Sequence, residues 1–194
     1  MAFWTDAVLQ DPKRQYRFVV TLGNMPNGAT WYAKSVTKPA LSITEVEHNF
    51  LNHKFYYPGR AEWESVELTL VDPVSPDAAA STAAIIQAGG YTPPSNVNDQ
   101  RTISKKDATA AINSVTIAQI DSEGNAIETW RLWNPFITSV SYGDLSYDSD
   151  EMSEISLTIR YDWAILETAH PAETAGAAAK FAGRREFFKP GSND

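Results

Sequence analysis

Cysteine is absent from the 194 residues of this chain, so neither a disulfide nor a thiolate-bound metal is part of its fold. Long apolar runs are absent too, since no stretch approaches the ~18 residues that a membrane helix needs. The first residues, Met1–Asp6, lack the basic and apolar regions of a secretory signal. We therefore expect a protein that folds in a cytoplasm and does not bind a membrane directly.

Positive charge is in short supply. Lys and Arg total 16 against 24 Asp and Glu, which gives a net charge of −8 and a sequence pI near 4.9. Proteins that grip nucleic acid usually carry a basic face, because neutralising phosphates supplies most of their affinity. Direct DNA binding is therefore not expected.

Recognised catalytic motifs are also missing. There is no glycine-rich phosphate loop after a strand and no nucleophile elbow. The histidines are His48, His53 and His170; on one strand His48 and His53 would point to opposite faces, which is poor geometry for a shared metal. We expect no enzymatic activity, no cofactor and no metal site.

Two clusters are the remaining candidates for chemistry. The acidic run of residues 144–154 lacks the glycine and terminal glutamate of a calcium loop, and a solvated hairpin explains it more simply. Trp130, Trp133 and Phe136 suit either core packing or a sugar-stacking platform.

What the chain does have is a series of strand patterns rich in aromatic and β-branched residues. The clearest alternation places Val66, Leu68 and Leu70 on one face and Glu67 and Thr69 on the other. Turn-forming residues predict turns at 23–28 and 57–60. The predicted strands are residues 16–22, 31–38, 42–52, 62–71, 113–121, 126–133, 136–142 and 151–163.

One helix is predicted over residues 78–88, with Ser75 as N-cap, Pro76 at the first helical position, Asp77 in the first turn and two glycines at its end. Residues 91–107 read as a long loop. The fold class is mostly β: a β sandwich or half-barrel with one helix, whose main sheet has one face in water. We expect a β domain over residues 1–167 and a C-terminal extension over 168–194, with a short helix near 171–181.

Several stretches resemble the tube proteins of contractile tails. Residues 52–73 resemble the segment in which a central loop ends in Gly-Arg before an alternating strand. Residues 128–140, 143–150 and 155–163 are similar to the C-terminal pattern of that family, and the strand beginning at Tyr16 also fits. The resemblance covers about residues 1–167.

This resemblance implies a structural subunit of a phage tail tube. Hexameric rings would join their inner strands into a continuous β-barrel and stack into a hollow tube through which the genome is delivered to the host. The implied partners are other copies of the chain, a tail sheath protein, a tape measure protein, and baseplate and tail terminator proteins. DNA would be only a passing cargo, and an acidic wall would let it slide without sticking. The implied location is the virion tail, assembled in the bacterial host cytoplasm.

Three alternatives remain open at this point. The same fold could form the inner tube of a contractile injection or type VI secretion system with a protein cargo. It could also form a tail-hub or tail-completion subunit. A carbohydrate-binding or hydrolysing β sandwich, using the tryptophan and acidic clusters, is the alternative from another class.

The sequence also predicts two assembly surfaces. The extended segment 42–60 is rich in exposed aromatics that would need a partner, so we expect inter-ring contacts from Phe50, Leu51, Phe55, Tyr56 and Tyr57. The polar faces of two amphipathic strands should line the channel, because their apolar neighbours must pack inward. These lumen-facing residues are Glu67, Thr69, Glu154, Ser156, Thr158 and Arg160, with Glu154 or Asp162 expected to neutralise Arg160.

Overall fold

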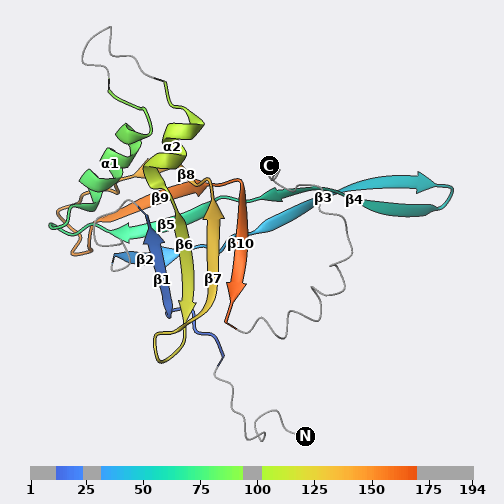
Figure 1. Ribbon diagram of the computed structural model, residues 1–194, viewed down its shortest axis with the longest axis horizontal. Helices are drawn as coiled ribbons and strands as arrows, with labels where there is room; N and C mark the ends of the chain where they lie inside the picture. Colours follow the sequence, from blue (N-terminus) through green and yellow to red (C-terminus); the bar gives the residue numbers. More distant parts are fainter. Residues whose placement is uncertain (1–11, 24–31, 94–101, 170–194) are drawn as a thin grey trace, which may run out of the picture.

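The computed structural model describes residues 12–23, 32–93 and 102–169. Two four-stranded antiparallel sheets form the body, one with the order β1-β6-β7-β10 and the other with the order β2-β5-β9-β8; we call them sheet A and sheet B (Figure 1). The mostly-β prediction is confirmed. The strands are β1 (Phe18–Leu22), β2 (Ala33–Val36), β3 (Leu41–Phe50), β4 (His53–Trp63), β5 (Val66–Val71), β6 (Val115–Ile120), β7 (Ala126–Trp133), β8 (Phe136–Ser141), β9 (Glu154–Arg160) and β10 (Trp163–Thr168).

The core lies between the two sheets, where every second residue of the central strands is buried. In sheet B, Leu68 of β5 stands opposite Leu157 of β9, and both are almost completely buried. Each large aliphatic side chain that is fully buried in this way stabilises the fold by about 1.5–3 kcal/mol. The remaining fully packed core residues are Val20, Leu22, Val66, Leu70, Ala78, Ile112, Val115, Ile117, Leu132, Ile155, Ile159 and Tyr161.

Two helices pack together at one end of the body, α1 (Ala78–Ala88) and α2 (Lys105–Ile112). The prediction of a single helix is wrong, because the segment read as a loop already contains the start of α2. Its N-cap is Ser104, whose hydroxyl accepts from Asp107 N at 3.1 Å. The N-cap of α1 is Asp77 rather than Ser75: its carboxylate accepts from Ala80 N at 2.8 Å. Neither described helix is long and apolar enough to cross a membrane.

The predicted strand over residues 151–163 is in fact two strands. The chain leaves sheet B after Arg160 and enters sheet A at Trp163, passing through Tyr161 and Asp162, whose N–H donates to Trp133 O at 3.0 Å. Tyr161 still faces the core, whereas Trp163 is exposed. The predicted alternation of buried and exposed residues therefore continues only as far as the crossover between the sheets.

Strands β3 and β4 form a separate two-stranded sheet that projects far from the body (Figure 1). Its turn lies at Leu51 and Asn52, and residues 57–60, predicted as a turn, belong to the middle of β4. Every residue of β3 is exposed. Residues 24–28 of the turn predicted at 23–28, the predicted helix near 171–181 and His170 lie outside the described residues.

Candidate assembly surfaces

One side of the projecting hairpin is apolar over its outer half. Residues that stand opposite each other on paired strands share a face, and Val46 pairs with Tyr57, while Phe50 pairs with His53. We call this side the apolar tip face. Its four apolar side chains are between 48% and 60% exposed, and no described part of the chain covers them. The face consists of Val46, His48, Phe50, His53, Phe55 and Tyr57.

The opposite side of the same half is polar. Glu47 forms an ion pair with Lys54, with 2.9 Å between carboxylate oxygen and Nζ, and Tyr56 stands opposite Glu47. The predicted inter-ring residues therefore gather at the hairpin, but not on one face. Phe50, Phe55 and Tyr57 lie on the apolar tip face, Tyr56 lies on the other face, and Leu51 lies in the turn.

A β-bulge at Gly59 moves the apolar side chains of β4 to the other face of the hairpin, so that they match those of β3 in both halves. In β3 the apolar positions switch from odd (Leu41, Ile43) to even (Val46, Phe50), whereas in β4 they are mainly odd along the whole strand, with Tyr56 and Pro58 as the exceptions. The register shifts by one residue between Ile43 and Glu45, and Thr44 Oγ1 accepts from Arg60 N at 2.9 Å. A Cβ at Gly59 would lie 2.4 Å from Thr44 Oγ1. This bulge was not predicted, although the switch from odd to even apolar positions in β3, without a matching switch in β4, is its signal in the sequence.

The two histidines of the hairpin lie on the same face, contrary to the prediction. They occupy different strands, with His48 opposite Phe55 and His53 opposite Phe50, so the parity rule for a single strand does not apply to them. Within the described residues, no three His, Cys, Asp or Glu side chains are grouped as a metal site would need.

The outer face of sheet B brings together all six residues predicted to line a channel. Glu67 stands opposite Thr158, and Thr69 stands opposite Ser156; each pair lies on the side away from the core. The strands at both edges extend the same face with further hydroxyl groups. These additions are Ser35 of β2 and Ser139 and Ser141 of β8.

The charge on this outer face is balanced rather than acidic. Lys34 forms an ion pair with Glu154, which leaves Glu67 and Arg160 as its other charged residues. The neutralisation expected for Arg160 is wrong in both forms, because Glu154 is bound to Lys34 and Asp162 is bound to Lys105 at 2.8 Å. The expected acidic wall is therefore not found on the described part of this face.

The tryptophan cluster does not form a single platform. Trp130 faces the interior and donates from Nε1 to Glu128 Oε1 at 2.7 Å. Trp133 lies on the opposite side of β7, stacked on Trp163 with ring centroids 5.8 Å apart. Phe136 lines a separate pocket. This arrangement removes the basis for a sugar-stacking surface built from all three residues.

Glu128 is the centre of a buried polar cluster that ties three segments together. Its carboxylate accepts from Lys38 at 2.7 Å and also forms an ion pair with Lys13. Burial opposes ionisation of this carboxyl, but the hydrogen bonds from Lys13, Lys38 and Trp130 outweigh it and lower the pKa of Glu128 to about 2. Lys38 also donates to Gln119 Oε1 at 2.8 Å. The cluster thus joins the segment after β2 to sheet A.

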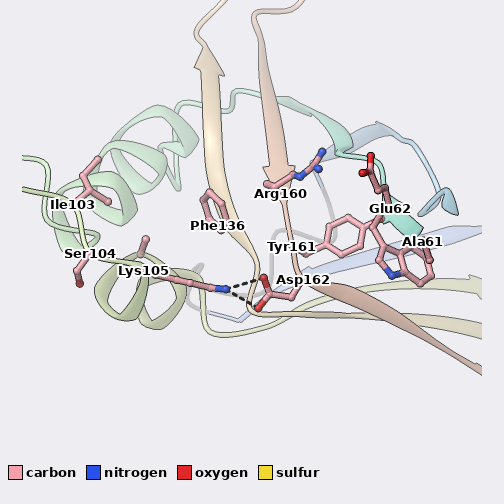
Figure 2. A pocket seen from close by; sticks show the side chains of 11 residues that line it. Ala61, Glu62, Ile103, Ser104, Lys105, Phe136, Arg160, Tyr161 and Asp162 are labelled. Atoms are coloured by element: carbon pink, nitrogen blue, oxygen red, sulfur yellow. Dashed lines mark hydrogen bonds and ion pairs between the residues drawn. The ribbon is translucent and has the colours of Figure 1, made fainter. Parts of the chain in front are cut away.

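A pocket of about 710 Å³ lies where the hairpin, α2 and the crossover between the sheets meet. Figure 2 shows Lys105 of α2 reaching to Asp162, and Asn134 Nδ2 also donates to that carboxylate at 2.7 Å. The pKa of Asp162 is lowered, first by the hydrogen bond from Lys105 and then by that from Asn134. Tyr161 also lines the pocket; among the described residues its hydroxyl is the one buried side-chain polar atom without a hydrogen-bond partner.

No protein-family model and no curated protein matches the chain. Among solved structures, the chain is similar to one from the anti-feeding prophage cap, a tube terminating cap, with a TM-score of 0.60 and 20% identity over 87% of this chain and 100% of that one. It is also similar to a chain of the sheath–tube complex of an extracellular contractile injection system, with a TM-score of 0.59 and 18% identity over 83% and 95%. A chain of the sheath/tube terminator of such a system gives a TM-score of 0.58 and 19% identity over 82% and 99%. The chain therefore has the fold of the tube and cap proteins of contractile injection systems.

Proposed function

We propose that the chain is a structural subunit of a tail tube, which assembles into rings that stack around a channel and turns over no substrate. The observation that carries the proposal is the projecting hairpin with its apolar tip face. A two-stranded hairpin is at best marginally stable alone in water, and an exposed apolar patch marks an interaction site. We assign this face to contact with the adjacent ring.

Sheet B supports the proposal for the ring itself. Its edge strands are β2 and β8, and three antiparallel steps between them make these two strands run in opposite directions. The β8 edge of one copy can therefore pair antiparallel with the β2 edge of the next. Six such joints would close a barrel, and closure removes the exposed edges that otherwise invite aggregation.

The outer face of sheet B would then line the channel. The inner face of sheet B packs in the core. The hydroxyl groups and balanced charges of its outer face suit a wall along which a cargo passes without binding. We propose a genome as that cargo, delivered to a host from a virion tail. The similarity to injection-system components favours a second candidate, an inner tube that carries protein.

The remaining partners follow from the same proposal. A tube of this kind would lie inside a sheath protein, enclose a tape measure protein, and end at baseplate and terminator proteins. Residues 1–167 would form the tube domain, with residues 168–194 as an extension.

Two neighbouring tyrosines provide a matched test by negative-stain electron microscopy. Tyr56 and Tyr57 are both 57% exposed but lie on opposite faces of the hairpin. Wild-type protein should form rings and hollow rods at high concentration, or when a baseplate component is present as initiator. Tyr57→Ser should leave single rings or free subunits, whereas Tyr56→Ser should still make rods.

If both variants formed rods equally well, the apolar tip face would not be part of the contact between rings. A wild-type protein that stays monomeric under all of these conditions would contradict the proposed function itself.

A further inference from the structure

We infer that the pocket between α2, the hairpin base and the sheet crossover receives the β8–β9 connection, residues 142–153, of a subunit in the adjacent ring. The inference rests on the tube function proposed above, and it adds a second, defined contact between rings.

The pocket is lined by charged and polar groups of both kinds, donors and acceptors. Tyr161 is only 4% exposed, yet its hydroxyl has no partner within the described residues, and leaving a buried polar group unpaired is costly. Arg160 lines the same pocket, and its two candidate carboxylates are bound to other lysines. The N-terminal end of α2 lies there as well (Figure 2), and a helix N-terminus favours anions. An occupant that brings a carboxylate would give Arg160 a partner, and Glu62, which also lines the pocket, would need an N–H or O–H donor from the same occupant.

The pocket is also apolar in part. Trp63, Ile103 and Phe136 line it together with the donors. Its volume of about 710 Å³ falls within the range of roughly 300–1,000 Å³ that is usual for clefts which bury a bound group. The occupant should therefore combine acidic side chains with large apolar ones.

The β8–β9 connection has this combination. Residues 142–153 contain Asp144, Asp148, Asp150 and Glu151 and no Lys or Arg. Leu145 and Tyr147 are almost completely exposed, and Met152 is also exposed. Side chains of this size that lie in water on an isolated subunit indicate a surface that another molecule covers.

The fold places the pocket and the connection at opposite ends of the same two strands. Phe136 begins β8 and Arg160 ends β9, and both line the pocket. The connection joins the other ends of these strands, roughly 20 Å away at about 3.3 Å per residue. The hairpin base, Ala61 to Trp63, lies at the pocket end. If the hairpin reaches the next ring, then head-to-tail stacking brings the connection of one copy to the pocket of another, as a heterologous interface requires.

Cysteine cross-linking tests this contact directly, because the natural chain has no thiol. A double variant, Ile103→Cys with Tyr147→Cys, would be assembled and treated with a short bis-maleimide. Contact along the tube axis should give a ladder on a denaturing gel that continues beyond the number of subunits in one ring, as counted by electron microscopy. Each single variant is the control and should give no product larger than a dimer.

A ladder that stops at the ring number would place the connection on a lateral neighbour and overturn the inference. Tubes that form without any cross-link would also overturn it, while leaving the proposed function intact. Failure of the wild type to form rings or tubes would refute both together.

If only the cysteine variant fails to assemble, the contact can be tested instead by measuring the protein concentration that single serine variants need to form tubes. Tyr147→Ser should raise it roughly tenfold, as loss of a buried interface aromatic does. Tyr91→Ser, at an exposed tyrosine outside both surfaces, should not. Equal values for the two variants would overturn the inference.

Discussion

Glu128, on β7 of sheet A, holds the segments before β1 and after β2 through ion pairs with Lys13 and Lys38. Replacing it by Gln keeps the size of the side chain but removes the charge that Lys13 and Lys38 contact. We expect Glu128→Gln to lower the free energy of unfolding by about 1–3 kcal/mol, the range for hydrogen bonds to charged groups. Urea denaturation of the unassembled subunit measures this, with Glu123→Gln in an exposed turn as the control.

The same residue predicts an acid-sensitive component of stability. The pKa of Glu128 is about 2 in the folded chain, against an ordinary value of 4.5. A carboxyl whose pKa is lowered by folding stabilises the protein above its unfolded value and loses that contribution as pH falls toward the folded value. Wild type should therefore lose stability between about pH 4.5 and 2, and Glu128→Gln should lose less over the same window. Parallel pH curves for the two proteins would contradict this assignment.

For Tyr161 we expect the opposite effect: removing its polar group should not destabilise the subunit. Its hydroxyl is buried and has no hydrogen-bond partner in the part of the chain that the structure describes, and burial is the first cause that raises its pKa. Tyr161→Phe removes a desolvated group and keeps the ring that lies 6.0 Å from that of Trp63. The unassembled subunit should be at least as stable as wild type, within about 0.5 kcal/mol, in urea denaturation. A clear loss of stability would show that the hydroxyl has a partner within the chain.

Sequence alone indicated the polar face of sheet B and the inward side of Tyr161, but not the Glu128 cluster. Alternation with a period of two fixes which side of a strand a residue takes, so Glu67 and Thr158 were each expected on a polar strand face, and the structure brings the two faces together. The Glu128 cluster depends on Lys13 and Lys38, which are 115 and 90 residues away in the chain. A local sequence pattern cannot show that side chains so far apart in the chain are in contact.

At the scale of elements, the hairpin depends on its bulge. Gly59→Ala would bring a Cβ within 2.4 Å of Thr44 Oγ1 and 2.9 Å of Thr44 O, and backbone cannot move away cheaply. We expect the two strands to separate locally, at a cost of about 1–3 kcal/mol as in other overpacked sites. Limited trypsin digestion measures this, because Lys54 and Arg60 lie in β4.

Cleavage at Lys54 and Arg60 should accelerate severalfold in Gly59→Ala. The rate at Lys105, in α2, should stay the same and is the internal reference. Unchanged cleavage in β4 would mean that the bulge does not hold the strands together.

The elements that sequence located best are those whose pattern is local and uninterrupted. Strand β7 was predicted with the bounds that the structure shows, because an alternating segment lies between two turn signals. Helix α2 was missed although Ser104 and Asp107 have the spacing of an N-terminal capping motif. The crossover at Tyr161 could not be foreseen, since a strand pattern does not reveal which sheet its continuation joins.

At the scale of the whole molecule, the channel-lining role that we propose for sheet B makes a specific prediction about access. Thr158→Cys lies on its outer face and should react readily with a bulky maleimide in free subunits but slowly in assembled tubes. Ser122→Cys, in the exposed turn between β6 and β7, should react at similar rates in both. Equal labelling of Thr158→Cys before and after assembly would show that this face points outward.

The sequence resemblance to contractile-tail tube proteins predicted the fold correctly, because the order of the strand patterns along the chain is visible in the sequence. It could not give the contacts between copies, which depend on how two separate surfaces meet. The five predicted inter-ring residues show this limit: a linear reading grouped Tyr56 with Tyr57, and only the pairing of β3 with β4 separates them.

The bulge at Gly59 also determines which kinds of genetic change the hairpin can survive. A single-residue insertion or deletion between Gly59 and Trp63 would exchange the two faces of the outer half, so that Phe55 and Tyr57 would turn to the side of Glu47 while Val46 and Phe50 would not. Changes of two residues would preserve the faces. We therefore expect variation among naturally occurring or selected versions of this hairpin to come as substitutions and even-numbered changes in length, with odd-numbered changes excluded.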